Sequence, residues 1–439
     1  MRWKTDSREH SEWYATKALA ESFRSDLLRA QRAGEAFEVA SGLPASLARR
    51  RNARTLLEVA TAYVDWLWTS GAPPNTRKGA VTNLAATVPL FVRQLDHAPD
   101  PGRLQRVLST RVLPPPCRAV PLTAEESATV SWLTRASRPL ADMADDIAAS
   151  ELLIALGKTA TGRTVTSSTW DKRRAVLHRA VEFARSSGWV EVNPLTGRRL
   201  AARHSGPVVV DPRVVVNPVQ ARQLLAAVTY VGGRRLRDRE RGARLHAFFA
   251  CLYYGGLRPG EAQGLRRQDC ELSADGWGRV LLARSRSEVT AGFYANDGAR
   301  HHERPLKRRR REDVRPVPIP PALVLILREH LAVFGTAPDG RLFYGVEKGE
   351  NVSASVYWRI WEQARAIGLS PEQAASPLAR RPYDLRHAAL SSWLAAGVPP
   401  TEVAERAGNS VKVLLTVYAK CLAGQADAYN ERIGVLLGS

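Results

Sequence analysis

The feature that constrains the fold most is an amphipathic stretch near the C-terminus, which begins just after the proline at position 382. Its apolar residues recur with the 3.6-residue period of a helix, and they are Leu385, Leu390, Trp393 and Leu394. Tyr383, Arg386 and His387 stand at its start, and a second such segment ends at Tyr418. Chemically active side chains are thus placed on segments that also pack against a core.

The spacing within this stretch restricts which side chains can meet. Asn409 lies nine positions before Tyr418, and nine residues of straight helix rise about 13 Å. We therefore expect a bend between these residues, with Asn409 in the turn that starts the later helix. On the earlier segment, Tyr383 and Arg386 are three residues apart and face the same side, whereas His387 points about 100° away from Arg386.

Length and charge bound the class of protein. The chain has 439 residues, which is enough for two or three domains with sizeable cores. It carries 64 Lys and Arg against 43 acidic residues, a formal net charge of +21, which favours a polyanionic partner. Without an apolar run near the roughly 18 residues of a spanning helix, nucleic acid is favoured over a membrane. An arginine-rich solvated surface is the alternative explanation.

Two further absences in the sequence guide the prediction. The N-terminus shows no signal-peptide pattern, so we expect a cytoplasmic, nucleoid-associated protein. The four cysteines are widely spaced and form no C-x-x-C pair, so neither a disulfide framework nor a zinc site is indicated. We likewise find no convincing metal-ligand cluster or phosphate-binding loop, and we predict neither a metal nor another cofactor.

Helix and turn signals divide the chain into three parts. Residues 1–45 suggest a small β-β-α module with Thr16 as the helix cap. Residues 55–205 are helical in pattern, and a proline-containing extended linker follows them. Asn217 and the proline after it then offer a helix start for a third part, residues 217–439. The fold class we expect is mainly α with small β-sheets, that is, α+β.

The helical part contains a candidate DNA-docking face. Thr123 begins a capping box, and residues 139–156 read as one helix. Another helix is expected from 166 to 187, with an apolar stripe on one side and basic residues on the other. Such a helix fits docking to DNA, although most charged helix faces are simply solvated. Its basic residues are Lys172, Arg173, Arg174 and Arg179.

A candidate anion site lies where two glycines and a proline separate two helices, at residues 255–265. Pro259 suits the first turn of the new helix, and Glu261 can close a cap on it. Arg258 then stands at a helix N-terminus, where backbone donors and the helix dipole favour an anion. A structural salt bridge is the alternative role of this arginine.

A basic run lies inside a long polar excursion between two expected strands, residues 277–283 and 314–319. It begins at Lys307 and continues with four arginines. Arginine is a poor proton donor because it essentially never loses its charge, so the four arginines suit clamping of phosphates. They are Arg308, Arg309, Arg310 and Arg311.

Taken together, residues 165–425 resemble the tyrosine recombinase (phage integrase) family. The family's box Gly-Leu-Arg-x-x-Glu is matched here by the segment from Gly256 to Glu261, which contains Arg258. Asp269 stands at a further family position. The family carries a catalytic lysine on a hairpin before a Val-Pro-x-Pro-type strand end. Here the segment Val317-Pro-Ile-Pro supplies that end, and Lys307 matches the lysine.

The later boxes match with two departures. The family's His-x-x-Arg is matched by Tyr383 and Arg386, and its Gly-His followed by a tyrosine is matched by Gly408, Asn409 and Tyr418. Two histidines are therefore replaced. A phenol with an ordinary pKa near 10 donates a hydrogen bond but is a poor base, and asparagine can still donate to a phosphate oxygen. We interpret both replacements as tolerated.

The resemblance implies a domain order and an activity. Residues 1–45 would be a truncated arm-site-binding module, 55–205 a helical core-type DNA-binding domain and 217–439 a mixed α/β catalytic domain. The implied protein is an actinobacterial-type, metal-independent integrase of an integrative element or prophage, which recombines DNA through a covalent 3′-phosphotyrosine. The implied partners are double-stranded DNA with attachment sites, further copies in a homotetramer, a directionality factor and a host DNA-bending protein, with no membrane.

The resemblance also implies roles for single residues. Two guanidiniums would hold the non-bridging phosphate oxygens, a lysine would protonate the leaving 5′ oxygen, and a tyrosine would form the covalent link. The implied catalytic residues are Arg258, Lys307, Tyr383, Arg386, Asn409 and Tyr418, with Glu261, Asp269 and His387 in support.

Three alternatives remain open from the sequence. A DNA-binding accessory protein with a degenerate active site would share the boxes without the reaction. A chromosome-dimer resolvase would be a shorter chain with less N-terminal sequence. A type IB topoisomerase shares the chemistry and would relax DNA without sequence preference.

Overall fold

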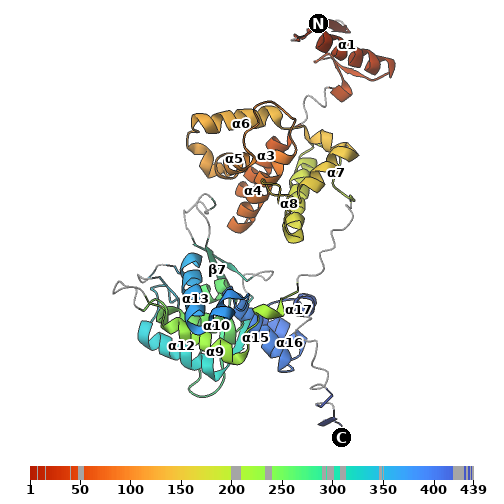
Figure 1. Cartoon of the computed structure of the whole chain (residues 1–439). Helices are drawn as coiled ribbons and strands as arrows, with labels where there is room; N and C mark the ends of the chain where they lie inside the picture. The colour runs from red at the N-terminus through yellow and green to blue at the C-terminus, as the bar shows by residue number, and fades with distance from the viewer. Residues whose placement is uncertain are drawn as a thin grey trace. The chain divides into compact units, whose positions relative to one another are not determined.

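The computed structural model describes residues 1–6, 8–14, 16–39, 41–47, 54–198, 209–232, 240–288, 293, 301–306, 313–345, 349, 351–418, 430–431, 434–435 and 437. The chain forms two compact units, Met1–Ser205 and Gly206–Ser439 (Figure 1). Among the described residues, every helix is too short or too polar to cross a membrane. The two units are described separately below.

The first unit begins with two small hairpins around one helix. β1 (Arg2–Thr5) pairs antiparallel with β2 (Arg8–Ser11), and β3 (Phe37–Glu38) pairs with β4 (Leu43–Pro44). Between them lies α1 (Lys17–Arg32), whose first turn is capped by the side chain of Thr16. The expected β-β-α order is confirmed, and β3–β4 adds a hairpin that the sequence pattern did not indicate.

The rest of the first unit is helical, as expected. Its elements are α3 (Leu56–Thr69), α4 (Pro74–Thr87), η1 (Val88–Leu90), α5 (Pro101–Val107), η2 (Leu108–Val112), η3 (Pro115–Ala119), α6 (Ala124–Ala136), η4 (Leu140–Ala144), α7 (Asp146–Ala155) and α8 (Ser167–Ser186). The capping box at Thr123 is confirmed. The single helix expected over 139–156 is wrong, because the Asp145 side chain accepts the N–H groups of Ile147 and Ala148 and so restarts the helix as α7.

The second unit contains helices around two small sheets. Its helices are η5 (Pro212–Val214), α9 (Pro218–Thr229), α10 (Ala243–Tyr254), α11 (Pro259–Gly264), η7 (Arg267–Asp269), α12 (Pro321–Phe334), α13 (Ala354–Gly368), α14 (Pro371–Ala375), α15 (Asp384–Ala395), α16 (Pro400–Ala407) and α17 (Val411–Val417). The expected helix start at Asn217 is confirmed, and Gln220 completes a capping box with it. Figure 1 shows α9, α10, α12 and α13 gathered around one centre, with α16 and α17 beside each other.

The strands form a sheet and a separate hairpin. β5 (Cys270–Glu271), β6 (Gly278–Leu282) and β9 (Arg315–Ile319) make an antiparallel sheet in the order β5-β6-β9. β7 (Arg284–Glu288) pairs antiparallel with β8 (His301–Pro305). The two strands expected from the sequence, at 277–283 and 314–319, are therefore confirmed as β6 and β9. The hairpin lies within the excursion between them.

Helix α10 is the centre of the second unit and positions the site. Its buried residues include Phe248 and Phe249, and they lie all around the helix, which is typical of a fully enclosed helix. Phe249 stacks on the ring of Trp361 at a centroid distance of 5.1 Å. The chain leaves α10 at Gly255 and reaches Arg258 after a turn whose Leu257 is also buried. The core therefore holds the start of α11 in place.

The bend expected between Asn409 and Tyr418 is confirmed. Helix α16 ends at Gly408, whose φ of 61° is left-handed, and Ser410 caps the start of α17. Asn409 lies in the turn between the two helices, and Tyr418 directly follows the last residue of α17.

Candidate active site

Glu261 is the centre of the candidate site. It occupies the third position of α11, and its side chain is 2% exposed. Its Oε1 accepts Arg258 Nη1 at 2.7 Å, and its Oε2 accepts Arg315 Nη2 at 2.8 Å. Arg386 Nη1 lies 3.9 Å from the same Oε2. Burial opposes ionisation, but the three guanidiniums outweigh it and lower the pKa of Glu261 to about 2.

Arg258 is held by contacts to α11 and to the turn that follows α16. Its own N–H donates to Glu261 Oε2 at 2.9 Å, which closes the cap that the sequence predicted. Its Nη2 donates to Gly408 O at 2.9 Å and to Asn409 Oδ1 at 2.7 Å. Burial disfavours its charge, but Glu261 and the phenol of Tyr383 outweigh this and raise the pKa of Arg258. Its side chain is still 23% exposed.

Arg315 is a site residue that the sequence reasoning missed. It lies at the start of β9 with a side chain 2% exposed, and it donates to Glu261. Its guanidinium packs against Gly408, where an added Cβ would collide with it. The alternating burial of β9 places Arg315 on the inner face with Val317 and Ile319, and this two-residue period is the signal that could have identified it.

Arg386 is the most deeply enclosed of the three arginines, with a side chain 1% exposed. It donates to Gly256 O through Nη1 and to Ala407 O at 2.6 Å through Nη2. Burial and the nearby charge of Arg258 lower the pKa of Arg386. The residue therefore joins the turn before α11 to the end of α16.

The two replaced histidine positions both contact Arg258. Tyr383 precedes α15, is half-buried, and its phenol interacts with the Arg258 guanidinium. Asn409 accepts from Arg258 through Oδ1, so its amide NH₂ remains the donor end of that side chain. Both side chains thus place polar groups at the same arginine.

The hydroxyl group of Tyr418 contacts His387. The distance from His387 Nδ1 to the Tyr418 hydroxyl oxygen is 2.8 Å, and the Tyr418 residue is 2% exposed. The ring of His387 also lies against that of Tyr383, with centroids 5.1 Å apart. Burial, Arg381 and Arg386 lower the pKa of His387 to about 4 against the opposing effect of Asp384. The imidazole is therefore neutral at pH 7.

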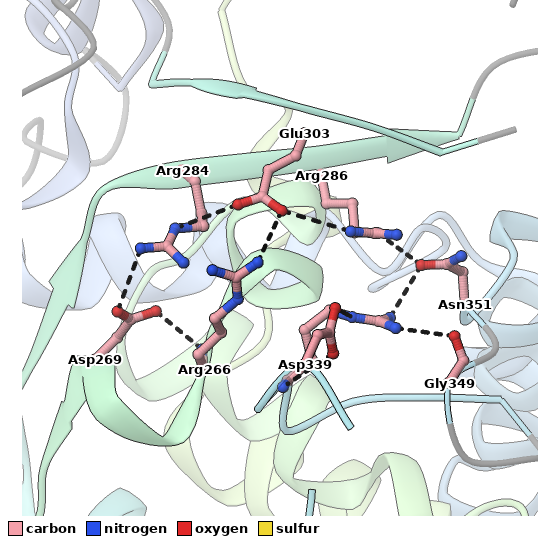
Figure 2. Close-up of polar contacts among 9 residues, drawn as sticks. Arg266, Asp269, Arg284, Arg286, Glu303, Asp339, Gly349 and Asn351 are labelled. Atoms are coloured by element: carbon pink, nitrogen blue, oxygen red, sulfur yellow. Dashed lines mark hydrogen bonds and ion pairs between the residues drawn. The ribbon is translucent and has the colours of Figure 1, made fainter. Parts of the chain in front are cut away.

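Asp269 belongs to a different network, which Figure 2 shows beneath the β7–β8 hairpin. It accepts the N–H of Arg266 at 3.0 Å and lies 3.8 Å from Arg284. Glu303 of β8 ties this network together, because its carboxylate lies within 3.1–3.5 Å of guanidinium nitrogens of Arg266, Arg284 and Arg286. The contacts continue to Asn351, Arg341, Asp339 and Gly349.

This second network anchors the hairpin to the body of the unit. Arg284 and Arg286 come from β7, whereas Arg266 precedes η7. Leu306, which directly follows β8, is buried in the hydrophobic core. Sequence reasoning did not single out Glu303, because an isolated glutamate in a polar stretch carries no spacing signal.

Several predicted residues are not brought to the site by the described structure. Lys307 and the four arginines from Arg308 to Arg311 lie outside the described residues. On α8, Lys172 and Arg179 are on the exposed side, and Arg174 donates to Arg198 O at 3.0 Å. Arg173 is buried, and it donates to Leu156 O at 2.9 Å and to Lys158 O at 2.6 Å.

The position of Arg173 corrects its expected place on the basic face of that helix. Its guanidinium donates to carbonyls in the segment that directly follows α7. Among the described residues, no group of three or more His, Cys, Asp or Glu side chains is arranged to hold a metal ion. The described part of the site is built from arginines, two phenols, the Asn409 amide, one imidazole and one carboxylate.

Comparisons with known proteins identify solved structures that share the fold of this chain. No family model matches the sequence, and no curated protein matches it. The Tn1549 transposon integrase in complex with transposon right end DNA has a TM-score of 0.56 at 15% identity, covering 87% of this chain and 100% of that chain. The same integrase with a circular intermediate DNA has a TM-score of 0.52 at 16% identity, covering 86% and 99%.

The XerH site-specific recombinase bound to palindromic difH substrate has a TM-score of 0.51 at 13% identity. That alignment covers 87% of this chain and 96% of XerH. At such low identity the likeness shows the fold and not the activity. The chain therefore has the fold of the tyrosine recombinases.

Proposed function

We propose that this protein is a site-specific DNA recombinase that cuts and rejoins DNA through a covalent 3′-phosphotyrosine on Tyr418. The observation that carries the proposal is the meeting of predicted residues from distant segments. Arg258 lies 2.7 Å from Asn409, 151 positions away in the sequence. Tyr418 lies 2.8 Å from a histidine of α15. The same helix α15 brings in Arg386, which shares Glu261 with Arg258.

The charges of this cluster suit phosphoryl transfer without further groups. Three guanidiniums surround one carboxylate, so positive charge is in excess at Arg258, the arginine with solvent access. A guanidinium presents planar paired donors that fit phosphate oxygens. Charge that develops on those oxygens during attack is stabilised by donors already held in position. In this arrangement Arg386 adds to the positive electrostatic potential at the phosphate. It also holds the turn before α11 to the end of α16.

The remaining roles are assigned by position in the family pattern. Lys307 would protonate the leaving 5′ oxygen, and Asn409 and Tyr383 would donate to the phosphate. Tyr418 would attack the phosphorus and conserve the bond energy for rejoining. Since Tyr418 is covered in this structure, DNA binding must shift the surrounding segments before attack. We further propose that the chain integrates or excises a mobile element as a tetramer on attachment-type DNA.

The DNA-facing surface of the first unit is proposed to include exposed basic residues of α8. Lys172 and Arg179 remain candidates. Arg174 is a third candidate, and its guanidinium lies over the ring of Trp170. Arg173 is left out because its side chain is buried and donates to two carbonyl groups. Asp269 supports the hairpin network and not the phosphate site.

Trapping of the covalent intermediate tests the proposal. A nicked half-site, taken from direct repeats that flank the gene, releases a short 5′ fragment on cleavage and prevents religation. Wild-type protein should then form a denaturation-resistant protein–DNA adduct. Tyr418→Phe should bind the duplex almost normally and form no adduct, because a single hydroxyl is lost. Mass spectrometry should locate the DNA on the peptide that contains Tyr418.

Tyr344→Phe is the matched control. Tyr344 is also buried in the second unit, and its hydroxyl donates to Phe334 O at 2.6 Å. This variant should keep wild-type adduct formation. An adduct that persists in Tyr418→Phe refutes the assignment of the nucleophile. Sequence-specific binding by wild type without any adduct would instead favour an accessory DNA-binding protein.

A further inference from the structure

The imidazole of His387 lies where a base could accept the hydroxyl proton of Tyr418. His387 and Tyr383 are four residues apart and so share one side of α15. The His387 ring lies between two phenols, 5.1 Å from the Tyr383 centroid and 5.7 Å from that of Tyr418. Arg386, the preceding residue, points to Gly256 and Ala407 instead. The two neighbours on α15 therefore serve different parts of the site.

The contact between His387 and Tyr418 has the geometry of a hydrogen bond to the nucleophile. Nδ1 lies 2.8 Å from the hydroxyl oxygen, a normal distance for such a bond. A neutral imidazole has one nitrogen that accepts and one that donates. Arginine has no acceptor, so the guanidiniums around Glu261 cannot take a proton from Tyr418. Of these neighbours, His387 is the one that can.

Resting on the proposed function, we propose that His387 is the catalytic base of the cleavage step, whose Nδ1 accepts the hydroxyl proton of Tyr418. In this step the O–H bond of Tyr418 breaks and an N–H bond forms on Nδ1. The phenolic oxygen bonds to the scissile phosphorus, and the bond from phosphorus to the 5′ oxygen breaks. That oxygen leaves with a proton from a separate acid, for which Lys307 is the candidate. Rejoining reverses each transfer, and His387 returns the proton to Tyr418.

The charges around His387 suit a base that accepts the Tyr418 proton when DNA is bound. Without DNA the imidazole is neutral, which is the form that can accept a proton. A phosphate brought to Arg258 adds negative charge near the ring, and opposite charge favours the imidazolium. The titratable and charged groups that act on this site are Tyr383, Asp384, Arg381, Arg386, Arg258 and Tyr418.

Two substitutions separate proton transfer from positioning. His387→Asn places an oxygen or nitrogen where Nδ1 stands, so it preserves a hydrogen bond without a basic group. His387→Ala removes the ring and leaves space for added imidazole. The measurement is the single-turnover rate of adduct formation by full-length protein on the nicked half-site, from pH 6 to 9, after half-site binding has been matched by gel shift.

We expect His387→Asn to react about 10²–10⁴-fold more slowly than wild type. Its rate should rise with pH, because Tyr418 must then lose its proton without help, and wild type should depend less on pH. Imidazole should restore part of the activity of His387→Ala. A half-site with a 5′-thio leaving group should rescue neither variant, because it replaces the acid and not the base.

His330→Asn is the matched control, since His330 is also buried between aromatic rings of the second unit, Phe334 and Phe343. Its rate per bound molecule should equal that of wild type. A His387→Asn rate within threefold of wild type overturns the inference. A slow His387→Asn with unchanged pH dependence, and no imidazole rescue of His387→Ala, also overturns it. These failures differ from failure of the proposed function, in which wild type itself forms no adduct.

Discussion

Replacing Glu261 with glutamine probes the arrangement on which the whole site depends. The folded chain lowers the pKa of Glu261 from an ordinary value of 4.5 to about 2, although the side chain is buried. At about 1.4 kcal/mol for each tenfold change in proton affinity, the fold stabilises the ionised carboxylate by about 3 kcal/mol. Three guanidiniums supply that stabilisation, and Arg315 and Arg386 are themselves fully buried.

Glu261→Gln keeps the shape of the side chain but removes the charge that compensates these arginines. Loss of one partner from a buried ion pair costs about 3–5 kcal/mol, so the second unit should lose about 3 kcal/mol at pH 7. Because the folded pKa is lowered, the contribution of Glu261 is complete above about pH 4.5 and disappears as the pH falls toward 2. The difference between wild type and variant should therefore shrink over this range.

The assay is a urea titration at pH 7, 5 and 3, read by pulsed hydrogen exchange and mass spectrometry. Peptides from α10 report the second unit separately from the first. Glu271→Gln is the control, because Glu271 pairs with Arg279 and both side chains are about half exposed, and it should cost well under about 1 kcal/mol. A loss below about 1 kcal/mol for Glu261→Gln, or a difference equal at pH 5 and pH 3, would refute the reasoning.

Two further predictions concern the turn and the hairpin. Gly408→Ala should destabilise the second unit by more than the about 1–2 kcal/mol typical of a left-handed alanine, because its Cβ meets Arg315. Gly188 follows α8 with the same pair of backbone hydrogen bonds, a φ of 74° and open space, so in urea titrations of the first unit Gly188→Ala should show the backbone cost alone. Lys307→Ala should slow cleavage about 10²–10⁴-fold and be rescued by a 5′-thio leaving group, with unchanged salt dependence of binding. Replacing Arg308–Arg311 by alanine should instead flatten the log–log salt slope by about 0.9 per lost phosphate contact, and a change in rate alone would show that the acid lies elsewhere.

The predictions from sequence succeeded where the cause is local. Capping depends on residues three positions apart, so Thr123, Asn217 and the pair Arg258–Glu261 could be placed from spacing alone. The bend after Asn409 followed from the rise of a helix. In contrast, the break at Asp145 was missed, since an aspartate within an apolar run gives no sign that it will cap a new helix.

Arg173 shows the limit of a periodic pattern. Its neighbours on α8 are basic, and its position near the edge of the apolar stripe does not reveal that the carbonyls of Leu156 and Lys158, just after α7, accept from its guanidinium. Those contacts arise only when the two helices pack. The same holds for Glu303, whose three arginine partners come from other segments.

The sequence by itself determined which side chains cap several helices, among them Thr123 and Asn217, and that an arginine, a glutamate and a tyrosine of the family pattern are present. Tertiary structure alone decided which of these side chains contact one another. Packing of α15, α16 and β9 around the end of α10 gives Glu261 three arginines, one of them Arg315. It also turns His387 toward Tyr418, 31 positions away. Contacts over such separations depend on burial of the helix faces between them, which spacing along a single segment does not encode.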